Sequence, residues 1–382
     1  MSTSKQARLR HFWFTFHLWI GVGLGILLLP LSVTGSLLVW HDGIDRMAHP
    51  ARYAVSGSEA LLAPSAYLKA ATEALDPALK PTVLRLPAEP GMPVTVAARG
   101  AAQGGGFPAM TTVYLDPPTS RVLDVADTGG SFMMLVHRFH GGLLVPGIGR
   151  QIVGWLGVAM LISSLSGIYL WWPRNGQFLK GLRWRRQPTT NANLHFTFGF
   201  WIAIPLAILS FTGAYISFPQ TARSVVGLFA EVGPQQQRGG GSGGFGAPVT
   251  PSLSPDAAAE AAIATVPGAR LLALTFPAGA NPAWRIQLLD GDRTRTVSVD
   301  DESGEVKAGR DRAASQPAAG DAFTRLMRQL HDGTDMGLAW QIVIFVGGLV
   351  PALLTVTGVI MWWRRRANRK ALARRLASTP AD

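Results

Sequence analysis

The segment Leu194–Pro219, LHFTFGFWIAIPLAILSFTGAYISFP, decides how this chain is organised. It has His195 at its start and Thr212-Gly213 near its end, and the apolar run between them is long enough to cross a bilayer. A similar run follows His17 and contains Thr34-Gly35. Both pairs of equivalent residues are offset by 178 positions (195 − 17 and 212 − 34), which indicates an internal repeat.

A second pair of segments repeats in the same way. LVHRFHGG at 135–142 matches LMRQLHDG at 326–333, so that His140 is equivalent to His331. Each segment leads into a run that ends in a pair of tryptophans, beginning at Gly167 in one case and at Gly358 in the other. The chain is therefore a duplicated unit, and each copy carries a histidine at two matching places.

Composition predicts an integral membrane protein. The chain has 382 residues, of which 48% are hydrophobic, and four apolar runs are about as long as a bilayer is thick. A signal peptide fits the first run poorly, because the run is too long and no small-residue cleavage site follows it. The four runs are Phe12–Trp40, Ile152–Trp172, Phe196–Phe218 and Gly337–Trp363.

The net charge of +12 reflects topology, because the basic residues cluster at particular ends of the apolar runs. They precede the first run and follow the second and fourth, whereas the long segments between runs mix both signs. This positive-inside pattern predicts four spans with both termini in the cytoplasm and argues against a nucleic-acid partner. The basic tail could also contact anionic lipid of the bilayer.

The absence of cysteine excludes whole classes of redox centre. It rules out disulfides, thiolate-bound iron–sulfur clusters and haem attached through a C-x-x-C-H motif. Any redox metal in this chain must be held by histidine or oxygen ligands.

The two long segments between runs predict small α+β modules. Each begins with a short helix, at Pro64 or Ser254, and continues with short β-like runs that close on a turn rich in Asp and Ser. A Gly/Gln/Ser-rich stretch at 233–248 is expected to be a linker, and Gly104-Gly-Gly a loop. The expected strands begin at Thr82, Val94, Thr112, Arg121, Leu271, Ala283, Thr294 and Glu305.

The expected fold class is therefore membrane α-helical. We predict a four-helix transmembrane bundle formed by a duplicated two-span unit, with two extracytoplasmic α+β modules. The expected boundaries are a cytoplasmic tail (1–11), span 1 (12–41), module 1 (42–136), an interfacial segment with span 2 (137–173), a basic cytoplasmic loop (174–194), span 3 (195–219), a linker with module 2 (220–325), an interfacial segment with span 4 (326–363) and a basic cytoplasmic tail (364–382).

The duplication predicts where the histidines meet. Repeats of two spans enter and leave on one side, so the two copies should be related by a pseudo-twofold axis along the membrane normal. His17 and His195 would then face each other near the cytoplasmic side, and His140 and His331 near the opposite side. Two histidines at one depth from different helices suit the axial ligation of a b-type haem. We therefore expect two haems at two depths, forming a path for electrons across the bilayer.

Other readings stay open for individual residues. A histidine at a span end can simply bond to lipid or to a backbone carbonyl, although that account must explain two matching pairs. His137 and His41 are alternative ligands for the outer haem, while His11 and His49 read as ordinary surface or interfacial residues. Basic residues that flank the outer histidines could pair with haem propionates or an anionic chelate, or could simply snorkel. These are Arg138, Arg150, Arg325 and Arg328.

Taken together, the motifs resemble the PepSY-associated transmembrane family over about residues 10–365. The resemblance lies in the order and duplication of His17-x-x-x-Gly21, Thr34-Gly35 followed by Asp42-x-x-Asp45, and His137-x-x-His140 followed by Ser166-Gly167. It implies that the two extracytoplasmic modules are PepSY-like. It also implies kinship with iron-regulated bacterial inner-membrane proteins that use bis-histidine b haems to reduce ferric siderophores.

The resemblance implies an oxidoreductase, a ferric-chelate reductase that converts periplasmic Fe(III) to Fe(II), with no catalytic residue beyond the haems. Some relatives carry a fused flavin and nicotinamide module, which this chain lacks. Its electrons must come from a separate cytoplasmic protein or from the quinol pool. Two alternatives remain: a non-enzymatic PepSY assembly or regulatory factor that binds a partner protein, and a haem-bearing partner of another periplasmic reductase.

Overall fold

A computed structural model describes residues 2–100, 109–173, 187–232, 249–279, 282–291, 293–307 and 319–377. The chain divides into two compact units. The membrane unit comprises Met1–His41, Val136–Ala230 and Ala322–Asp382, and the sheet unit comprises Asp42–Leu135 and Glu231–Asp321. The predicted linker (233–248), the Gly-rich loop at 104 and the basic run 174–186 lie outside the described residues.

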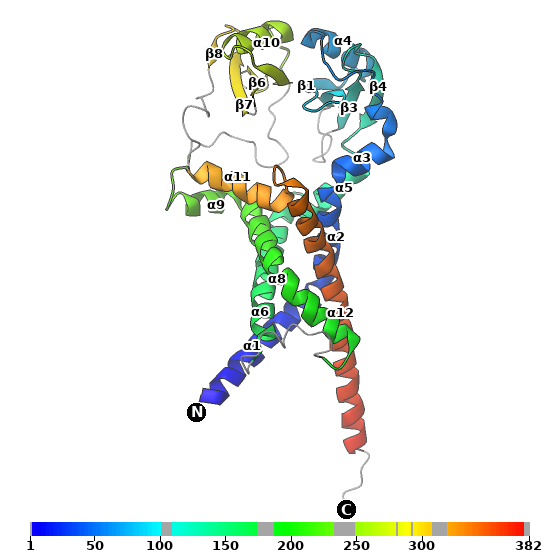
Figure 1. The fold of residues 1–382 in the computed structure, drawn as a ribbon, viewed down its shortest axis with the longest axis vertical. Coiled ribbons are helices and arrows are strands. Elements are labelled where there is room, and N and C mark those ends of the chain that lie inside the picture. The colour runs from blue at the N-terminus through cyan, green and yellow to red at the C-terminus, as the bar shows by residue number, and fades with distance from the viewer. Residues whose placement is uncertain are drawn as a thin grey trace, which may run out of the picture. The chain divides into compact units, whose positions relative to one another are not determined.

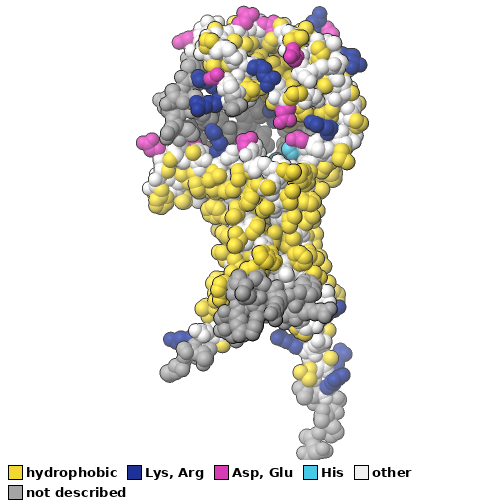
Figure 2. Space-filling view, in the orientation of Figure 1, with side chains coloured by type: hydrophobic (Ala, Val, Ile, Leu, Met, Phe, Trp, Pro, Cys, Tyr) yellow, Lys and Arg dark blue, Asp and Glu magenta, His cyan; other side chains and the backbone are white. Residues whose placement is uncertain are grey.

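Long apolar helices build the membrane unit (Figure 1). Three of them are long and apolar enough to cross a membrane, and a fourth span exists if a strongly bent pair counts as one. Figure 2 shows a largely hydrophobic surface over these helices, with Lys and Arg towards the two chain ends. The helices are α1 (Ser2–Gly23), α2 (Gly25–Val39), α5 (Phe132–Gly142), α6 (Gly149–Trp171), α8 (Thr190–Ser217), α9 (Pro219–Val226), α11 (Ala319–Asp332) and α12 (Gly337–Ala377).

The first apolar run is not one straight helix. It consists of α1 and α2, which meet at Leu24 with a bend of 69°. Glycines at positions 21, 23 and 25 surround the bend, and glycine weakens a helix because its unfolded backbone is so free. The equivalent stretch of the second copy, inside α8, continues unbroken through Pro205. The two copies therefore differ in shape at this point.

Small residues let the spans approach closely, as expected for helices in lipid. α6 packs on α8, α12 packs on α2 and α8, and α1 packs on α6. The Ser36 hydroxyl of α2 donates to the Phe345 carbonyl of α12 at 2.8 Å, beside Gly348, where no side chain would fit. This hydrogen bond joins the first copy to the second inside the unit.

The sheet unit contains one continuous sheet where the sequence predicted two modules. All eight strands are antiparallel in the order β4-β3-β2-β1-β5-β6-β7-β8, so β1 of the first copy pairs directly with β5 of the second. The predicted strands all occur, within a few residues of their expected starts. They are β1 (Lys80–Arg85), β2 (Val94–Arg99), β3 (Met110–Leu115), β4 (Val122–Asp127), β5 (Arg270–Thr275), β6 (Ala283–Asp290), β7 (Arg293–Asp300) and β8 (Val306–Lys307).

Two helices, α4 (Pro64–Ala74) and α10 (Pro255–Ala264), cover one face of this sheet (Figure 1). The strands alternate buried and accessible residues, so one side of each strand enters the core. Tyr67, Leu84, Val96, Leu274 and Trp284 are among the core residues, and they come from both copies. The duplicated modules thus share a single hydrophobic core.

A buried aspartate closes each half of the sheet unit. Asp116, after β3, accepts hydrogen bonds from the backbone amide and hydroxyl of Ser56 and from the Thr119 hydroxyl. Asp301, after β7, accepts from the backbone amides of Ser252 and Leu253 and from the Trp284 indole. In each half, the carboxylate therefore links two segments. One is the segment that precedes the helix (α4 or α10), and the other is the turn that follows a strand (β3 or β7).

Replacing Asp116 by Asn should destabilise the sheet unit in a pH-dependent way. Burial alone would raise the pKa of this carboxyl, but the hydrogen bonds from Ser56 and Thr119 and the charge of Arg121 outweigh burial and lower the pKa. The ionised form therefore stabilises the fold at neutral pH, by about 2 kcal/mol for bonds to a charged group. The parent should therefore have a higher free energy of unfolding than Asp116→Asn at neutral pH. This difference should disappear as the pH falls from about 4, the pKa of an aspartate in the unfolded chain, through the lower pKa of Asp116 in the folded protein.

Thermal unfolding of the full-length protein in detergent, recorded from pH 7 down to the acid limit, measures this difference. Glu73→Gln, an exposed carboxylate on α4, is the matched control and should unfold like the parent. Equal stability of Asp116→Asn and parent at pH 7 would contradict the assignment.

Candidate functional site

Two pairs of histidines lie inside the membrane unit. The ring centres of His17 on α1 and His195 on α8 are 6.2 Å apart, with their planes at 89°. The ring centres of His140 on α5 and His331 on α11 are also 6.2 Å apart, with their planes at 35°. Each pair joins one histidine of the first copy to its equivalent in the second.

Each histidine ring lies in a similar place on a neighbouring helix, which we call a histidine seat. A seat consists of a backbone carbonyl, a Ser or Thr hydroxyl three residues later, and the glycine that follows this hydroxyl. The histidine Nδ1 contacts the polar atoms, and its Cε1 edge lies against the glycine. The seats are Leu31/Thr34/Gly35 for His140, Ser163/Ser166/Gly167 for His17, Leu209/Thr212/Gly213 for His331 and Leu354/Thr357/Gly358 for His195.

The partners in the seats decide the tautomer of each ring. The Nδ1 atoms of His140, His17 and His331 lie 3.0–3.1 Å from backbone carbonyls, which can only accept. His195 Nδ1 lies 3.1 Å from the Thr357 hydroxyl, whose own hydrogen is donated to carbonyls of α12. All four Nδ1 atoms must therefore carry the proton, which leaves the lone pair on Nε2. Among the described residues, none of these Nε2 atoms has a hydrogen-bond partner.

The seat glycines make room for the rings, although not equally. A Cβ added to Gly35 would lie 2.7 Å from His140 Cε1, and one added to Gly213 would lie 2.9 Å from His331 Cε1. At Gly167 and Gly358 the corresponding distances to His17 and His195 are 3.4 Å, an ordinary contact. The seats of the His140/His331 pair are therefore the tighter ones.

The environment keeps the His140/His331 pair neutral. Burial, the main cause, and the neighbouring His331, the second, together lower the pKa of the His140 imidazole to about 4. Burial likewise lowers the pKa of His331, whose bond to the Leu209 carbonyl opposes the shift only partly. Neutral imidazole with a lone pair on Nε2 is the form that binds a metal.

A cavity of about 580 Å³ surrounds the His17/His195 pair. Its walls are mainly apolar and aromatic, with contributions from Trp171, Phe200 and Trp362. Four basic residues of α12 also line it: Arg365, Arg366, Arg369 and Lys370. A cavity of this volume suits a cofactor with an apolar body and anionic groups at one edge.

Each pair has two imidazoles that could hold a metal-centred cofactor, and a cavity for the body of such a cofactor is described at the His17/His195 pair. His17 with His195, and His140 with His331, would hold such a group through their unprotonated Nε2 atoms. Metal-bound histidines also typically donate their second N–H to a carbonyl or similar acceptor, as all four do here. A site for a metal held by three or more side chains is a poor alternative, since no such group of His, Asp and Glu occurs among the described residues.

The other predicted residues fall outside this geometry. His137 and His41 are exposed, and His41 Nδ1 lies 3.1 Å from the Leu38 carbonyl of its own chain turn. The Arg150 guanidinium donates to the Ile216 carbonyl, while Arg325 and Arg328 are exposed on α11. Arg138 is half-buried on α5. The structure does not bring His137 or His41 into either pair.

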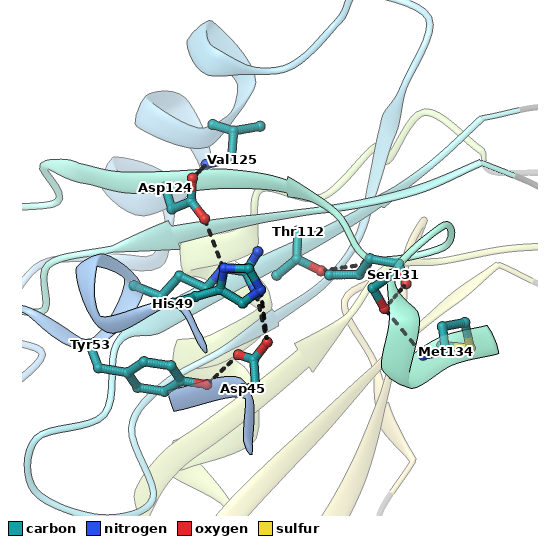
Figure 3. Close-up of polar contacts among 10 residues, drawn as sticks. Asp45, His49, Tyr53, Thr112, Asp124, Val125, Ser131 and Met134 are labelled. Atoms are coloured by element: carbon teal, nitrogen blue, oxygen red, sulfur yellow. Dashed lines mark hydrogen bonds and ion pairs between the residues drawn. The ribbon is translucent and has the colours of Figure 1, made fainter. Parts of the chain in front are cut away.

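A separate polar cluster lies in the sheet unit (Figure 3). Arg52, which follows helix α3 (His41–Ala48) in the short helix η1 (Pro50–Tyr53), is 8% exposed and forms ion pairs of 2.7 Å with both Asp45 and Asp124. The Tyr53 hydroxyl donates to Asp45, and the Arg52 guanidinium lies over the Tyr114 ring. Arg52 bridges the two carboxylates, one of which lies on β4, so we assign the cluster to the attachment of η1 to the sheet.

Sequence reasoning missed two parts of the site. It did not link the Ser/Thr-Gly pairs to the histidines of other helices, which these pairs seat. It also explained the basic residues after the fourth run by topology and by contact with anionic lipid, although four of them line the inner cavity. The constant spacing of the histidines and Ser/Thr-Gly pairs in both copies was the signal that could have linked them.

The fold and the paired histidines define a multi-helix membrane protein with two part-buried histidine pairs. A family model described as PepSY-associated TM region matches residues 14–365, so the chain belongs to the PepSY-associated transmembrane family. No curated protein matches the chain.

The unequal seats give a test that does not depend on any cofactor. Gly35→Ala and Gly213→Ala should destabilise the protein by about 1–3 kcal/mol each, because the new methyl group overlaps a held imidazole. Gly167→Ala and Gly358→Ala are the matched controls and should stay within about 1 kcal/mol of the parent. Thermal unfolding in detergent measures all four, and an equal effect at the four glycines would contradict the described seats.

Proposed function

We propose that this protein is a di-haem b-type electron-transfer protein of the bacterial inner membrane that reduces ferric chelates, such as ferric siderophores, in the periplasm. The observation that carries the proposal is the presence of two histidine pairs with ring centres 6.2 Å apart, in which each Nδ1 is hydrogen-bonded to a neighbouring helix and each Nε2 is left unprotonated. Haem held this way would supply reversible one-electron chemistry without an open coordination position. His17 with His195, and His140 with His331, would hold the two groups.

The positions of the sites along α8 support transfer across the bilayer. This helix carries His195 near its start, and its Thr212-Gly213 seats His331 near its end. Eighteen residues separate His195 from Gly213, which corresponds to about 27 Å of helix axis. The hydrocarbon core of a bilayer is about 30 Å thick, so an electron entering at one site and leaving at the other crosses most of it.

The basic lining of the inner cavity supports the same proposal. Arg365, Arg366, Arg369 and Lys370 would pair with the propionates of an inner haem, as cations commonly do with carboxylates. The same cluster would place this site, and both chain termini, on the cytoplasmic side under the positive-inside rule.

The proposed reaction is the one-electron reduction of Fe(III) in the chelate to Fe(II). The electron comes from a cytoplasmic protein or from a membrane quinol, and each two-electron quinol would reduce two ferric ions. Siderophores bind Fe(II) far less tightly, so reduction releases the iron for uptake.

Purified protein from haem-replete cells should contain about two b haems per chain, one for each bis-histidine pair. The dithionite-reduced minus oxidised absorption spectrum, together with haem quantified per chain, measures this. His17→Ala with His195→Ala, or His140→Ala with His331→Ala, should each leave about one haem. His49→Ala and His137→Ala should leave two.

The two ring-plane angles provide a second readout on the same samples. Axial imidazoles at 89° should give the highly anisotropic low-spin ferric EPR signal, and those at 35° a more rhombic signal. Each paired His→Ala variant should lose one signal and keep the other. A colourless protein would overturn the proposal and favour the non-enzymatic PepSY factor.

Reductase activity is tested by mixing the dithionite-reduced protein, freed of excess dithionite, with a ferric chelate under anaerobic conditions. The haem bands should return to the oxidised form while a coloured Fe(II) chelator captures about one Fe(II) per haem, because each b haem gives up one electron. Protein lacking His140 and His331 should react far more slowly. A haem-loaded protein that stays reduced would instead fit a partner of a separate periplasmic reductase.

A further inference from the structure

On the middle strands β1, β2, β5 and β6, the sheet face opposite α4 and α10 carries charged residues of one sign, whereas the flanking strands place Asp124 and Asp300 on the same face. Residues that alternate with the core residues of β1, β2, β5 and β6 form this open face, opposite α4 and α10. The charged residues placed there by the strand register are Lys80, Arg85, Arg99, Arg270 and Arg285. The acidic residue in these strands, Asp290, lies on the same side of β6 as the core residues and so belongs to the other face of the sheet. It forms an ion pair of 2.8 Å with Arg295.

The helix-covered side of the unit is different. α4 carries Lys69 and Glu73, and α10 carries Asp256 and Glu260, so acidic groups are present there. Surfaces of soluble proteins usually intersperse both signs, and a large single-sign field is normally reserved for attracting a charged ligand. The open face is therefore suited to an anion.

The strand register places Arg85 and Arg285 in two adjacent cross-strand rows of this face. One cross-strand row reads Thr95, Arg85, Ala273, Gln287 and Thr296 over five strands. The next row reads Ala97, Val83, Thr275, Arg285 and Ser298. Ala273, the smallest residue of its row, lies between Arg85 and Gln287.

The spacing of Arg85 and Arg285 fits a ligand larger than a simple ion. They are two strands and one row apart, which corresponds to about 12 Å between their Cα atoms. Both side chains are exposed. Two guanidinium groups that reach inward from this distance can bind separate carboxylate or other oxygen groups of one ligand, each in a bidentate manner.

The two arginines also come from different copies of the repeat, β1 from the first and β6 from the second. The site therefore exists only because the copies join at the β1–β5 pair. We propose that this open face binds an anionic metal chelate rich in oxygen ligands, with Arg85 and Arg285 as its charged anchors. The choice of a chelate rests on the proposed function, whereas the preference for an anion rests on the face itself.

Gallium(III) citrate is a suitable probe for the full-length protein, because gallium(III) matches the charge of Fe(III) and is not reduced. Calorimetry should show binding that weakens as salt is added. The double variant Arg85→Gln with Arg285→Gln should lose at least about tenfold in affinity, the scale of one lost charge-assisted contact. Lys69→Gln, on the helix side, is the control and should bind like the parent.

Three results would overturn the proposal: no binding of gallium citrate, equal binding by the double variant, or equally tight binding of metal-free citrate. The double variant Arg85→Lys with Arg285→Lys should recover part of the affinity, which separates charge from a folding defect. The haem spectrum of the same samples separates this inference from the proposed function, because it should be unchanged in every arginine variant. A colourless parent that still binds gallium citrate would refute the haem proposal alone.

Discussion

The structure of the membrane unit depends on one requirement: a buried imidazole N–H must find an acceptor. In lipid there is no water to satisfy it, and the carbonyls of a regular helix are already used. The histidine seats meet this requirement with a carbonyl and a hydroxyl that share the Nδ1–H, next to a glycine that lets the ring come close enough. Once Nδ1–H is satisfied on one side, the lone pair of Nε2 must point away from the seat. The seats thus fix the orientation of the rings through protein contacts alone.

Each copy of the repeat supplies half of each site. Within the first copy, the ring of His17 contacts its seat on α6, and the ring of His140 contacts its seat on α2. Within the second copy, the ring of His195 contacts its seat on α12, and the ring of His331 contacts its seat on α8. The two halves face each other only when the copies associate. The sheet unit follows the same rule, since its continuous sheet and shared core form across the β1–β5 pair. Duplication therefore creates symmetric sites at the contact between copies, and the differences between copies, such as the bend at Leu24, make the two halves unequal.

The sequence predicted much of this because its signals were periodic and repeated. The presence of long apolar helices, the strand positions and the repeat of the histidines followed from hydropathy and from two constant offsets. The merger of two modules into one sheet could not be predicted, because cross-strand pairing between copies leaves no mark on the local pattern of β1 or β5. The bend at Leu24 is a balance between glycine-rich backbone and tertiary packing, which a hydropathy run does not record. The role of Thr212 and its equivalents depends on which helix packs against which, information held only by the assembled fold.

The pairing of β1 with β5 has a consequence for biosynthesis. The ribosome completes β1 at Arg85 and reaches β5 at Arg270, 185 residues later (270 − 85). During that interval β1 is an open edge of a four-stranded half-sheet, the kind of edge that promotes pairing with other chains. Pro81, the irregular register beside it and the charges of Lys80 and Arg85 are features that discourage such pairing. Residues of β1 that lie at the centre of the finished sheet would thus first protect the exposed edge of the half-sheet from pairing with other chains.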